Sequence, residues 1–231
     1  MNLAHPDLPM TATPSPSLTQ RAYELLREDL MACRFEPGDP LRISELCTRL
    51  AVSQGAVREA LSRLTSEGLV EARPQRGFRV MPNSAADLRD LTDARVDIEK
   101  ICLRRAIAAG DLNWEARIVA VFHRLSRTPT IDEGPPRRFN AAFVALHDEF
   151  FDALVAGCDS PWLSRMRQML SVQERRYHGR LRPPVAGERD LIAELRAVMD
   201  AALARDAELA CSLIAAHMQR SAETLIAQMG G

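Results

Sequence analysis

The chain has 231 residues, which is enough for one or two domains with hydrophobic cores, and its composition is that of an ordinary globular protein. A formal net charge of −1 excludes a chain that is basic throughout, so any contact with nucleic acid has to be local. The sequence contains no apolar run of the roughly 20 residues that span a membrane, no signal-peptide pattern at its start and no CxxC pair. We therefore expect a cytoplasmic protein without membrane contact.

The N-terminal third begins with a segment unlike the rest. Residues 1–17 contain four prolines and predict a flexible tail. Apolar residues at helical spacing then predict a helix over 18–33, which ends before the turn signal Pro37-Gly38. Two more helices are predicted close together: about 44–50, and from the N-cap Ser53 to near Gly68.

The third predicted helix has an apolar and a polar side. Gln54, Gly55 and Arg58 share the polar side at about 100° per residue. Gln can pair with adenine, Arg can bind guanine through two hydrogen bonds, and Gly would allow a close approach to the DNA backbone. Glu59 points elsewhere and can pair with Arg63 one turn later. The alternative is an amphipathic helix with a solvated polar face. The apolar side follows the i, i+3/i+4, i+7 rule and predicts burial: Val57, Ala60, Leu61 and Leu64.

A strand–turn–strand pattern comes directly after this helix. It carries three arginines, Arg73, Arg76 and Arg79, and there is no acid between Glu71 and Asp87, so the local charge is +3. A turn tip with an exposed Arg can enter the minor groove or hold phosphates. Helix, turn, helix and hairpin in this order predict a winged helix-turn-helix, whose second helix enters the DNA major groove.

Three phrases in this region, "PGDPL", "LAVSQGAVREALSRLTSEGLV" and "QRGFRV", resemble the DNA-binding domain of the GntR family of bacterial transcription regulators. The resemblance covers about residues 18–81 and implies binding to a double-stranded DNA operator. The family pattern often has Arg where this chain has Ser44 and Gln54, which leaves the operator sequence open. By position, the resemblance implies DNA contacts from the second helix, the third helix and the wing tip: Ser44, Arg49, Ser53, Gln54, Gly55, Arg58, Arg76 and Gly77.

Beyond a short linker at 82–85, residues 86–231 show helical patterns without a strand pattern, so we expect a mainly α protein with an all-α second domain. The phrases "LRDLTDARVDIEKICLRRAIAAG" and "ELRAVMDAALARDAELACSLIAAHM" resemble the FCD effector domain of the FadR-type branch of the same family. Its coarse helices are predicted at 86–109, 113–127, 136–157, 161–180, 188–204 and 206–229.

Polar residues on apolar stripes suggest an effector pocket in this domain. Arg95 lies among apolar residues, and a buried Arg needs a partner, which is either Glu99 one turn later or a carboxylate ligand. His147 and His217 also lie among apolar residues. Each alone is more often a core histidine than a ligand, but the resemblance to FCD domains implies that both line one cavity.

FCD domains often hold a divalent metal with one Asp and three His. At the corresponding positions this chain has His147, Phe151, Leu195 and His217, and Phe and Leu have no donor atoms. Two ligands are fewer than the usual three, so we expect no metal and no other cofactor. The resemblance and the buried Arg instead predict an effector pocket formed by Arg95, His147, Phe151, Leu195 and His217.

The sequence thus predicts a transcription regulator, a repressor by family habit, that acts as a homodimer on a palindromic operator. A small anionic metabolite, a carboxylate by the chemistry of Arg95, would control it without a metal. Two alternatives remain: a metal-dependent FCD regulator, and a DNA-binding protein without an effector, in which Arg95 and Glu99 form a core ion pair. We expect no enzyme, since the chain has no nucleophile elbow, phosphate loop or HExxH pattern.

Overall fold

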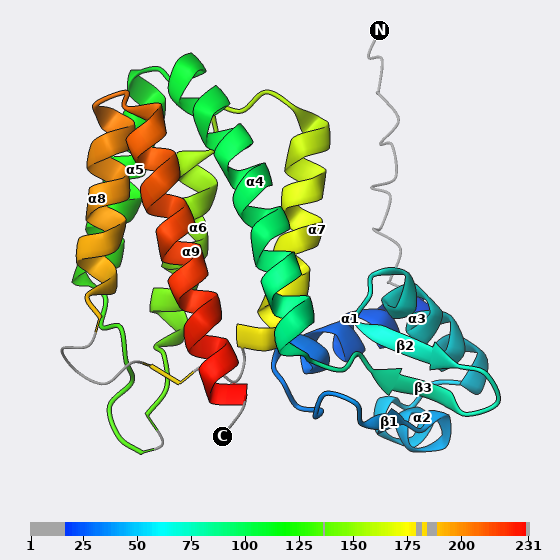
Figure 1. Ribbon diagram of the computed structural model, residues 1–231. Helices are drawn as coiled ribbons and strands as arrows, with labels where there is room; N and C mark the ends of the chain where they lie inside the picture. Colours follow the sequence, from blue (N-terminus) through cyan, green and yellow to red (C-terminus); the bar gives the residue numbers. More distant parts are fainter. Residues whose placement is uncertain (1–16, 136, 179–181, 184–188, 230–231) are drawn as a thin grey trace, which may run out of the picture.

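The computed structural model describes residues 17–135, 137–178, 182–183 and 189–229. The protein is mostly helical, as predicted, with a small three-stranded sheet in the N-terminal part (Figure 1). All of the predicted tail except Ser17, which caps the first helix, lies outside the described residues. We call the N-terminal part the head; its elements are α1 (Leu18–Met31), β1 (Pro40–Leu41), α2 (Ile43–Leu50), α3 (Gln54–Ser66), β2 (Val70–Arg73) and β3 (Gly77–Val80).

The head has a core between α1 and α3, with the sheet beside them. The predicted apolar stripe of α3 is fully turned inward and packs against Leu26 of α1, which is 1% exposed. The prediction missed one strand: the two-residue β1 pairs antiparallel with β3, which places β3 in the middle of the sheet. Two residues are too few to leave an alternating pattern in the sequence.

A buried carboxylate holds the second helix against the first. Asp29 of α1 is 6% exposed and accepts from Arg34 and from Arg49 of α2, each at 2.5 Å. Arg49 also stacks over the ring of Phe35, 5.0 Å from its centroid. An unpaired buried carboxylate would be costly, so Arg34 and Arg49 both compensate its charge, and Arg49 links α2 to α1.

The second part, the helical domain, consists of α-helices within its described residues. The helix predicted at 136–157 begins later, because Ile131 and Phe139 form an antiparallel bridge and Asn140 then caps the helix by accepting from two backbone N–H groups. Likewise Asp190 caps the helix predicted from 188. The helices are α4 (Ala85–Ala109), α5 (Leu112–Arg127), α6 (Ala141–Leu154), α7 (Pro161–His178), α8 (Leu191–Leu203) and α9 (Ala207–Met229).

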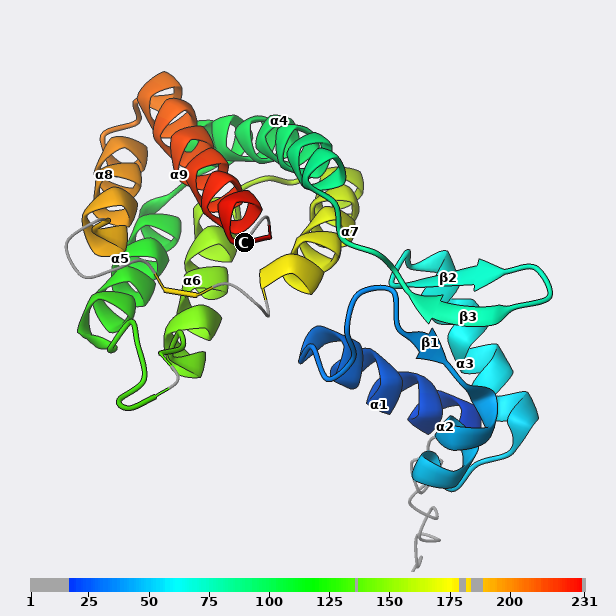
Figure 2. The same ribbon diagram turned by 60° about the horizontal axis from the view of Figure 1, so that its bottom comes forward.

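The helical domain has one main core. Helix α4 packs against α7 and α9, α9 packs against α8, and α5 packs against α6 and α8 (Figure 2). Phe122 and Phe150 meet at its centre with ring centroids 5.8 Å apart, and Leu195 is fully buried in the same cluster. No described helix combines the length and the apolar composition that crossing a membrane requires.

Helix α7 contacts both parts of the protein. Its Val172 packs on the core of the head, and Gln173 donates from its side-chain amide to the backbone oxygen of Glu67, the C-cap of α3. One turn later, Arg176 pairs with Asp87 at the start of α4. On its other side α7 packs along α4. A single helix therefore joins the end of the predicted recognition helix to the interior of the helical domain.

Candidate functional site

The start of α3 presents the polar side chains predicted to read DNA. Gln54, Gly55 and Arg58 are all exposed, and no described residue forms an ion pair with Arg58. Ser53 is exposed as well, and its hydroxyl accepts from the backbone N–H of Ala56 at 3.3 Å. Ser53 thus satisfies one of the free N–H groups of the helix start, which leaves the neighbouring N–H groups and the positive end of the helix dipole facing outward.

The predicted ion pair of α3 is not formed. Glu59 accepts a long hydrogen bond from Thr19, at 3.5 Å, and Arg63 instead donates to Gln20 at 2.8 Å and stacks over Tyr23. These partners lie on α1, which spacing along α3 alone does not show. Arg63 is therefore part of the contact between α1 and α3.

The two residues of α2 that were predicted to contact DNA, Ser44 and Arg49, differ in their interactions within the protein. Ser44 is exposed near the start of the helix. Arg49 is partly exposed, but its guanidinium is held by Asp29 and Phe35. A phosphate at Arg49 would therefore meet a side chain that is already oriented, with its charge partly neutralised.

The wing has less free charge than the sequence suggested. Arg73 and Arg79 both pair with Glu71, at 3.0 Å and 2.6 Å. Glu71 stands on β2 opposite Arg79 of β3, so counting charges only after Glu71 overstated the local excess. Arg76, at the exposed turn, is left without an ion pair among the described residues. Next to it Gly77 has φ +82°, a conformation that favours glycine.

The helical domain contains a cavity of about 60 Å³ where four of the five predicted effector residues meet. Leu195, the fifth, is fully buried in the core and does not line it, so its assignment to the pocket was wrong. Most of the residues that line this cavity are polar or charged. Its lining residues come from α4, α6, α7 and α9: Arg95, His147, Asp148, Phe151, Asp152, Arg167, Ser171, Glu174, Arg175, His178, His217, Met218 and Ser221.

Arg95 is not paired with Glu99, which corrects one alternative of the sequence analysis. It forms an ion pair with Glu174 of α7, and Glu99 pairs instead with Arg167 of α7, at 2.7 Å. All of these side chains are largely buried between α4 and α7. Burial lowers the pKa of Arg95 to about 10, so it stays charged at neutral pH. The partners come from a helix about 70 residues away, which the i, i+4 rule does not address.

The two predicted histidines are directly hydrogen-bonded to each other. Their Nε2 atoms lie 3.2 Å apart, and Nδ1 of His217 lies 2.8 Å from Glu194 of α8. Because a carboxylate only accepts, His217 carries its hydrogen on Nδ1 and accepts from His147 through Nε2. Arg189 completes the chain by binding Glu194 at 2.8 Å. Arg189 and Glu194 were not predicted as site residues. Arg189 lies just before α8 and Glu194 lies in its first turn, and neither belongs to a recognisable sequence motif.

These groups titrate far from their ordinary ranges. Burial lowers the pKa of His217 to about 4, although its hydrogen bond to Glu194 opposes the shift. Burial alone would raise the pKa of Glu194, but the hydrogen bonds from His217 and Arg189 lower it to about 2. At neutral pH, the imidazole of His217 is therefore neutral and lies beside the ionised carboxylate of Glu194.

The residues at the family's metal positions provide two nitrogen donors, His147 and His217, whereas three protein ligands are usual. Phe151 and Leu195 provide no donor atom, and within the described parts of the chain no three His, Cys, Asp or Glu residues are grouped so that they could hold a metal ion. The described donor set does not fit a closed metal site.

His178 is a cavity residue that the sequence analysis did not place. It lies one turn after Glu174, at the end of α7, and its Nε2 is buried without a hydrogen-bond partner in the described residues. Burial, together with the nearby Arg95, lowers the pKa of His178 to about 3. A buried polar atom without a partner is costly unless a ligand or water binds it. Only the folded position of α7 shows this nitrogen at the cavity.

We expect stability to fall between pH 7 and pH 5. His178 and His217 stay neutral in the folded protein over this range, while an unfolded His takes up a proton below about 6.5, so the unfolded state binds more protons and is favoured as pH falls. His217→Gln should reduce the slope of unfolding free energy against pH, measured by urea unfolding at several pH values. Met218→Leu changes the same cavity without a titrating group and should keep the wild-type slope. An unchanged slope in His217→Gln would contradict the assignment.

Comparison with known proteins agrees with this architecture. Residues 18–80 match the family described as bacterial regulatory proteins, gntR family, and residues 90–220 match the FCD domain. The chain is 39% identical over 209 residues to BphR of Paraburkholderia xenovorans, an uncharacterized HTH-type transcriptional regulator, covering 89% of this chain and 84% of that protein. It is 37% identical over 155 residues to the HTH-type transcriptional repressor GlaR of Escherichia coli, covering 67% and 70%.

The fold is shared with solved structures of lower identity. McbR/YncC of E. coli superposes with a TM-score of 0.72 at 22% identity, covering 92% of this chain and 99% of that one. The resemblance to the family drawn from the sequence is confirmed, as is the expectation that the protein is not an enzyme. The chain belongs to the gntR family of bacterial regulatory proteins and is a DNA-binding transcription regulator with an FCD domain.

Proposed function

We propose that the head binds a palindromic operator with α3 in the major groove and the β2–β3 turn at the adjacent backbone or minor groove. The observation that carries this assignment is the pair Arg58 and Arg76: both are exposed, and neither has an ion pair among the described residues, unlike Arg49, Arg73 and Arg79. Free guanidinium groups can bind DNA without first breaking a bond within the protein. Gln54 and Gly55 complete the base-reading side, and Ser44, Ser53 and Gly77 the backbone contacts.

The protein acts in this proposal as a homodimer and as a repressor, as some of its relatives are named. Palindromic operators match two-fold protein symmetry, with half-sites about one DNA turn apart. The regulatory signal is a small carboxylate metabolite in the cavity of the helical domain, bound without a metal. The volume of about 60 Å³ supports a small ligand and not an acyl chain.

Within the cavity, His178 and Arg95 are the groups that support a carboxylate ligand. His178 Nε2 is buried without a hydrogen-bond partner among the described residues, the nearest carboxylate being Glu174 Oε1 at 3.9 Å. The ion pair of Arg95 with Glu174 can be exchanged for one with a ligand oxygen. Such an exchange would act on α7, because Glu174 lies between two residues that hold this helix to its neighbours. Gln173, directly before it, binds the end of α3, and Arg176, two residues after it, binds the start of α4. The ligand can shift the placement of the two heads only by binding one arrangement more tightly.

The alternative is a metal-dependent regulator, which the close approach of His147 and His217 favours. Stoichiometric zinc, nickel or manganese in protein purified without a chelator would establish this alternative. A pocket that takes up no metal on titration would exclude it.

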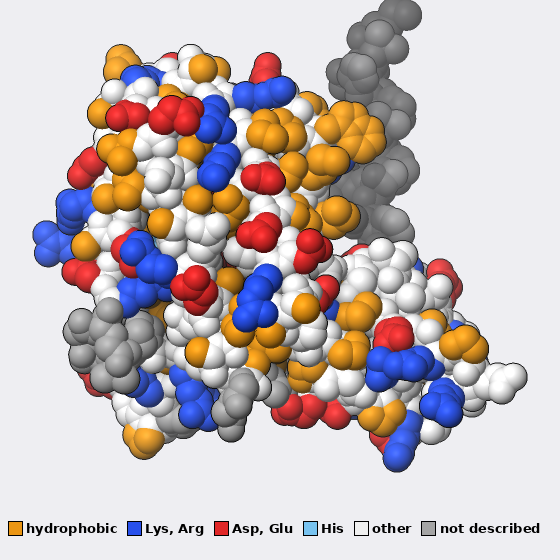
Figure 3. Space-filling view, in the orientation of Figure 1, with side chains coloured by type: hydrophobic (Ala, Val, Ile, Leu, Met, Phe, Trp, Pro, Cys, Tyr) orange, Lys and Arg blue, Asp and Glu red, His pale blue; other side chains and the backbone are white. Residues whose placement is uncertain are grey.

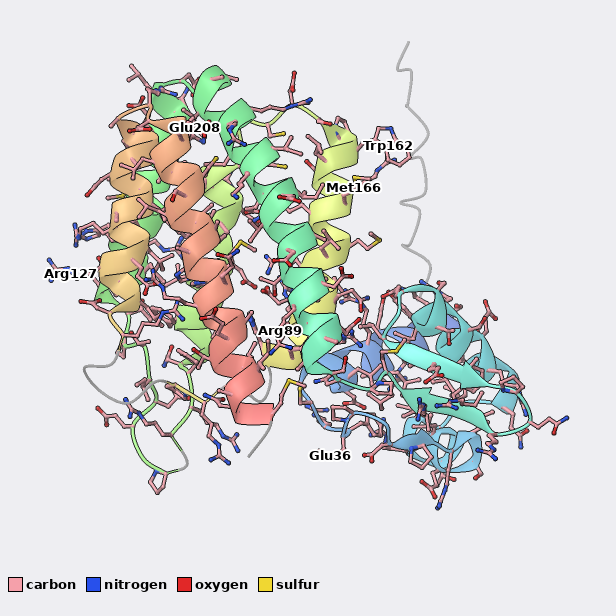
Figure 4. All side chains as sticks on the ribbon, in the orientation of Figure 1. Glu36, Arg89, Arg127, Trp162, Met166 and Glu208 are labelled. Atoms are coloured by element: carbon pink, nitrogen blue, oxygen red, sulfur yellow. The ribbon has the colours of Figure 1, made fainter. Side chains whose placement is uncertain are left out.

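Arg58→Ala should weaken operator binding by about 1–3 kcal/mol and relax the preference for the base that it contacts. Arg76→Ala should weaken binding more uniformly across sequences and lower the slope of log affinity against log salt by about 1, because one phosphate contact is lost. Fluorescence anisotropy on operator and mutated operators measures both effects. Arg127→Ala removes an exposed Arg at the far side of the helical domain (Figure 4) and serves as the control. Wild-type binding by both head variants would show that the recognition surface lies elsewhere.

Gly55→Ala should separate stability from DNA binding. A Cβ at this position meets nothing nearer than 3.9 Å, and Ala stabilises a helix by up to about 1 kcal/mol relative to Gly. We therefore expect an unchanged or higher melting temperature together with weaker operator binding, because the added methyl group holds α3 away from the DNA backbone. Equal affinity would mean that α3 does not approach the DNA at this residue.

Small mono- and dicarboxylates should raise the melting temperature of the protein, and the corresponding amides should not. At a ligand concentration of 100 times Kd the expected stabilisation is about 2.7 kcal/mol. His178→Ala should lose this effect while keeping the Arg95–Glu174 pair; Ser171→Ala, at the same cavity, is the matched control. If no carboxylate stabilises the wild type, the regulator without an effector is favoured.

A further inference from the structure

Two of the five cysteines lie next to each other in the helical domain, and the proposed function uses neither of them. Cys102 stands on α4, and Cys158 lies in the connection between α6 and α7. Both are free thiols, and their side chains are hydrogen-bonded to each other. The two residues are far apart in the chain, so only the fold brings their sulfur atoms together.

A close approach of two backbone segments produces this contact. Figure 1 shows the connection between α6 and α7 passing along α4 at the end of the helical domain away from the head. A Cβ on Gly157 would lie 2.9 Å from the carbonyl oxygen of Ala106 and 3.1 Å from its Cα, so a glycine is required here. Cys102 lies one turn before Ala106 on the same side of α4. Cys158, directly after Gly157, is thereby held beside Cys102.

The two thiols differ in their access to solvent. Apolar and charged side chains cover the outer surface of α4 and α7 (Figure 3), and Cys102 lies beneath this surface, 1% exposed. Cys158 is partly exposed. Burial raises the pKa of Cys102 to about 12, the neighbouring Cys158 adds to this shift, and the guanidinium of Arg167 opposes it. At neutral pH Cys102 is therefore protonated and a poor nucleophile, because the thiolate is the reactive form.

We propose that Cys102 and Cys158 form a site of reversible oxidation, at which hydrogen peroxide joins them by a disulfide bond. The accessible sulfur of Cys158 attacks one peroxide oxygen; the O–O bond breaks, and the products are a sulfenic acid and one water, which takes the thiol proton. The sulfur of Cys102 then attacks the Cys158 sulfur. The S–S bond forms, the S–O bond breaks, and the hydroxide leaves as a second water with the proton of Cys102. The two thiols together lose two electrons and two protons, and a reducing dithiol reverses the reaction.

The disulfide would add a covalent link where ion pairs already hold α7. Cys158 lies shortly before Pro161, the first residue of α7. Farther along α7, Arg167 binds both Glu99 of α4 and Asp152 of α6. The bond would therefore join α4 to the start of α7, at the end of this helix opposite to its contact with the head. Disulfides that form only on oxidation are typical of redox sensing in reducing compartments.

The test is a disulfide map of the full-length protein. The protein is treated with a small excess of hydrogen peroxide, its remaining thiols are blocked with iodoacetamide, and it is digested with trypsin. We expect mass spectrometry to find tryptic peptides 101–104 and 139–165 joined, since each contains one cysteine. The number of thiols counted in denaturant should fall from five to three, and dithiothreitol should restore all five. The bond lies within one chain, so a non-reducing gel should show no cross-linked dimer.

Three variants separate the site from the other cysteines. Cys158→Ser removes the accessible thiol and should abolish the loss of thiols. Cys47→Ser, at a partly exposed cysteine of α2, is the matched control and should still lose two thiols. Gly157→Ala keeps both cysteines, but its methyl group meets the backbone of Ala106, so disulfide formation should slow by about 10-fold or more. Circular dichroism of each reduced variant checks its fold.

Several results would overturn the inference. One is oxidation of Cys158 to its sulfinic acid while Cys102 stays a free thiol, and another is a disulfide between other cysteines or between two chains. A wild type that keeps all its thiols under conditions that oxidise glutathione would overturn it as well. None of these results bears on operator binding or on the effector cavity, whose described lining contains neither cysteine.

Discussion

The ion pair between Arg95 and Glu174 is the interaction on which the arrangement of this protein depends. It joins α4 to α7 in the interior, next to the second pair, Glu99 with Arg167. Removing one partner of a buried pair costs about 3–5 kcal/mol, because the remaining charge has no water to solvate it. Helix α7 packs against α4 and the head among the described elements, so these pairs fix its position and rotation.

The rotation of α7 determines what each of its sides does. One side lines the cavity with Arg167, Glu174 and His178. Another packs on the head, where Val172 and Gln173 reach the core and the C-cap of α3. The outer side carries exposed apolar residues, among them Trp162. The cavity and the end of the predicted recognition helix are therefore both in contact with α7.

The parts of the protein that depend on local rules could be predicted from the sequence. The buried stripe of α3, from Val57 to Leu64, follows from helical spacing alone, and Ser53 caps the helix as its residue type suggests. The six helices of the second domain were found with errors only near their ends. Where local rules were applied to charges, they failed: Arg63 binds α1, and Glu71 balances Arg73 and Arg79 across the hairpin.

The sequence by itself was enough to identify the family, the mainly helical fold and the predicted recognition helix, and to bring Arg95, His147 and His217 to one predicted cavity. Family-typical phrases and helical periodicity are properties of neighbouring residues, which is why they could be read without the structure. Only the tertiary structure decided which charges remain free. It paired Arg95 with Glu174, placed Leu195 in the core and left His178 Nε2 without a hydrogen-bond partner among the described residues. The physical reason is that burial and pairing depend on which helices meet, and that contact joins residues far apart in the chain.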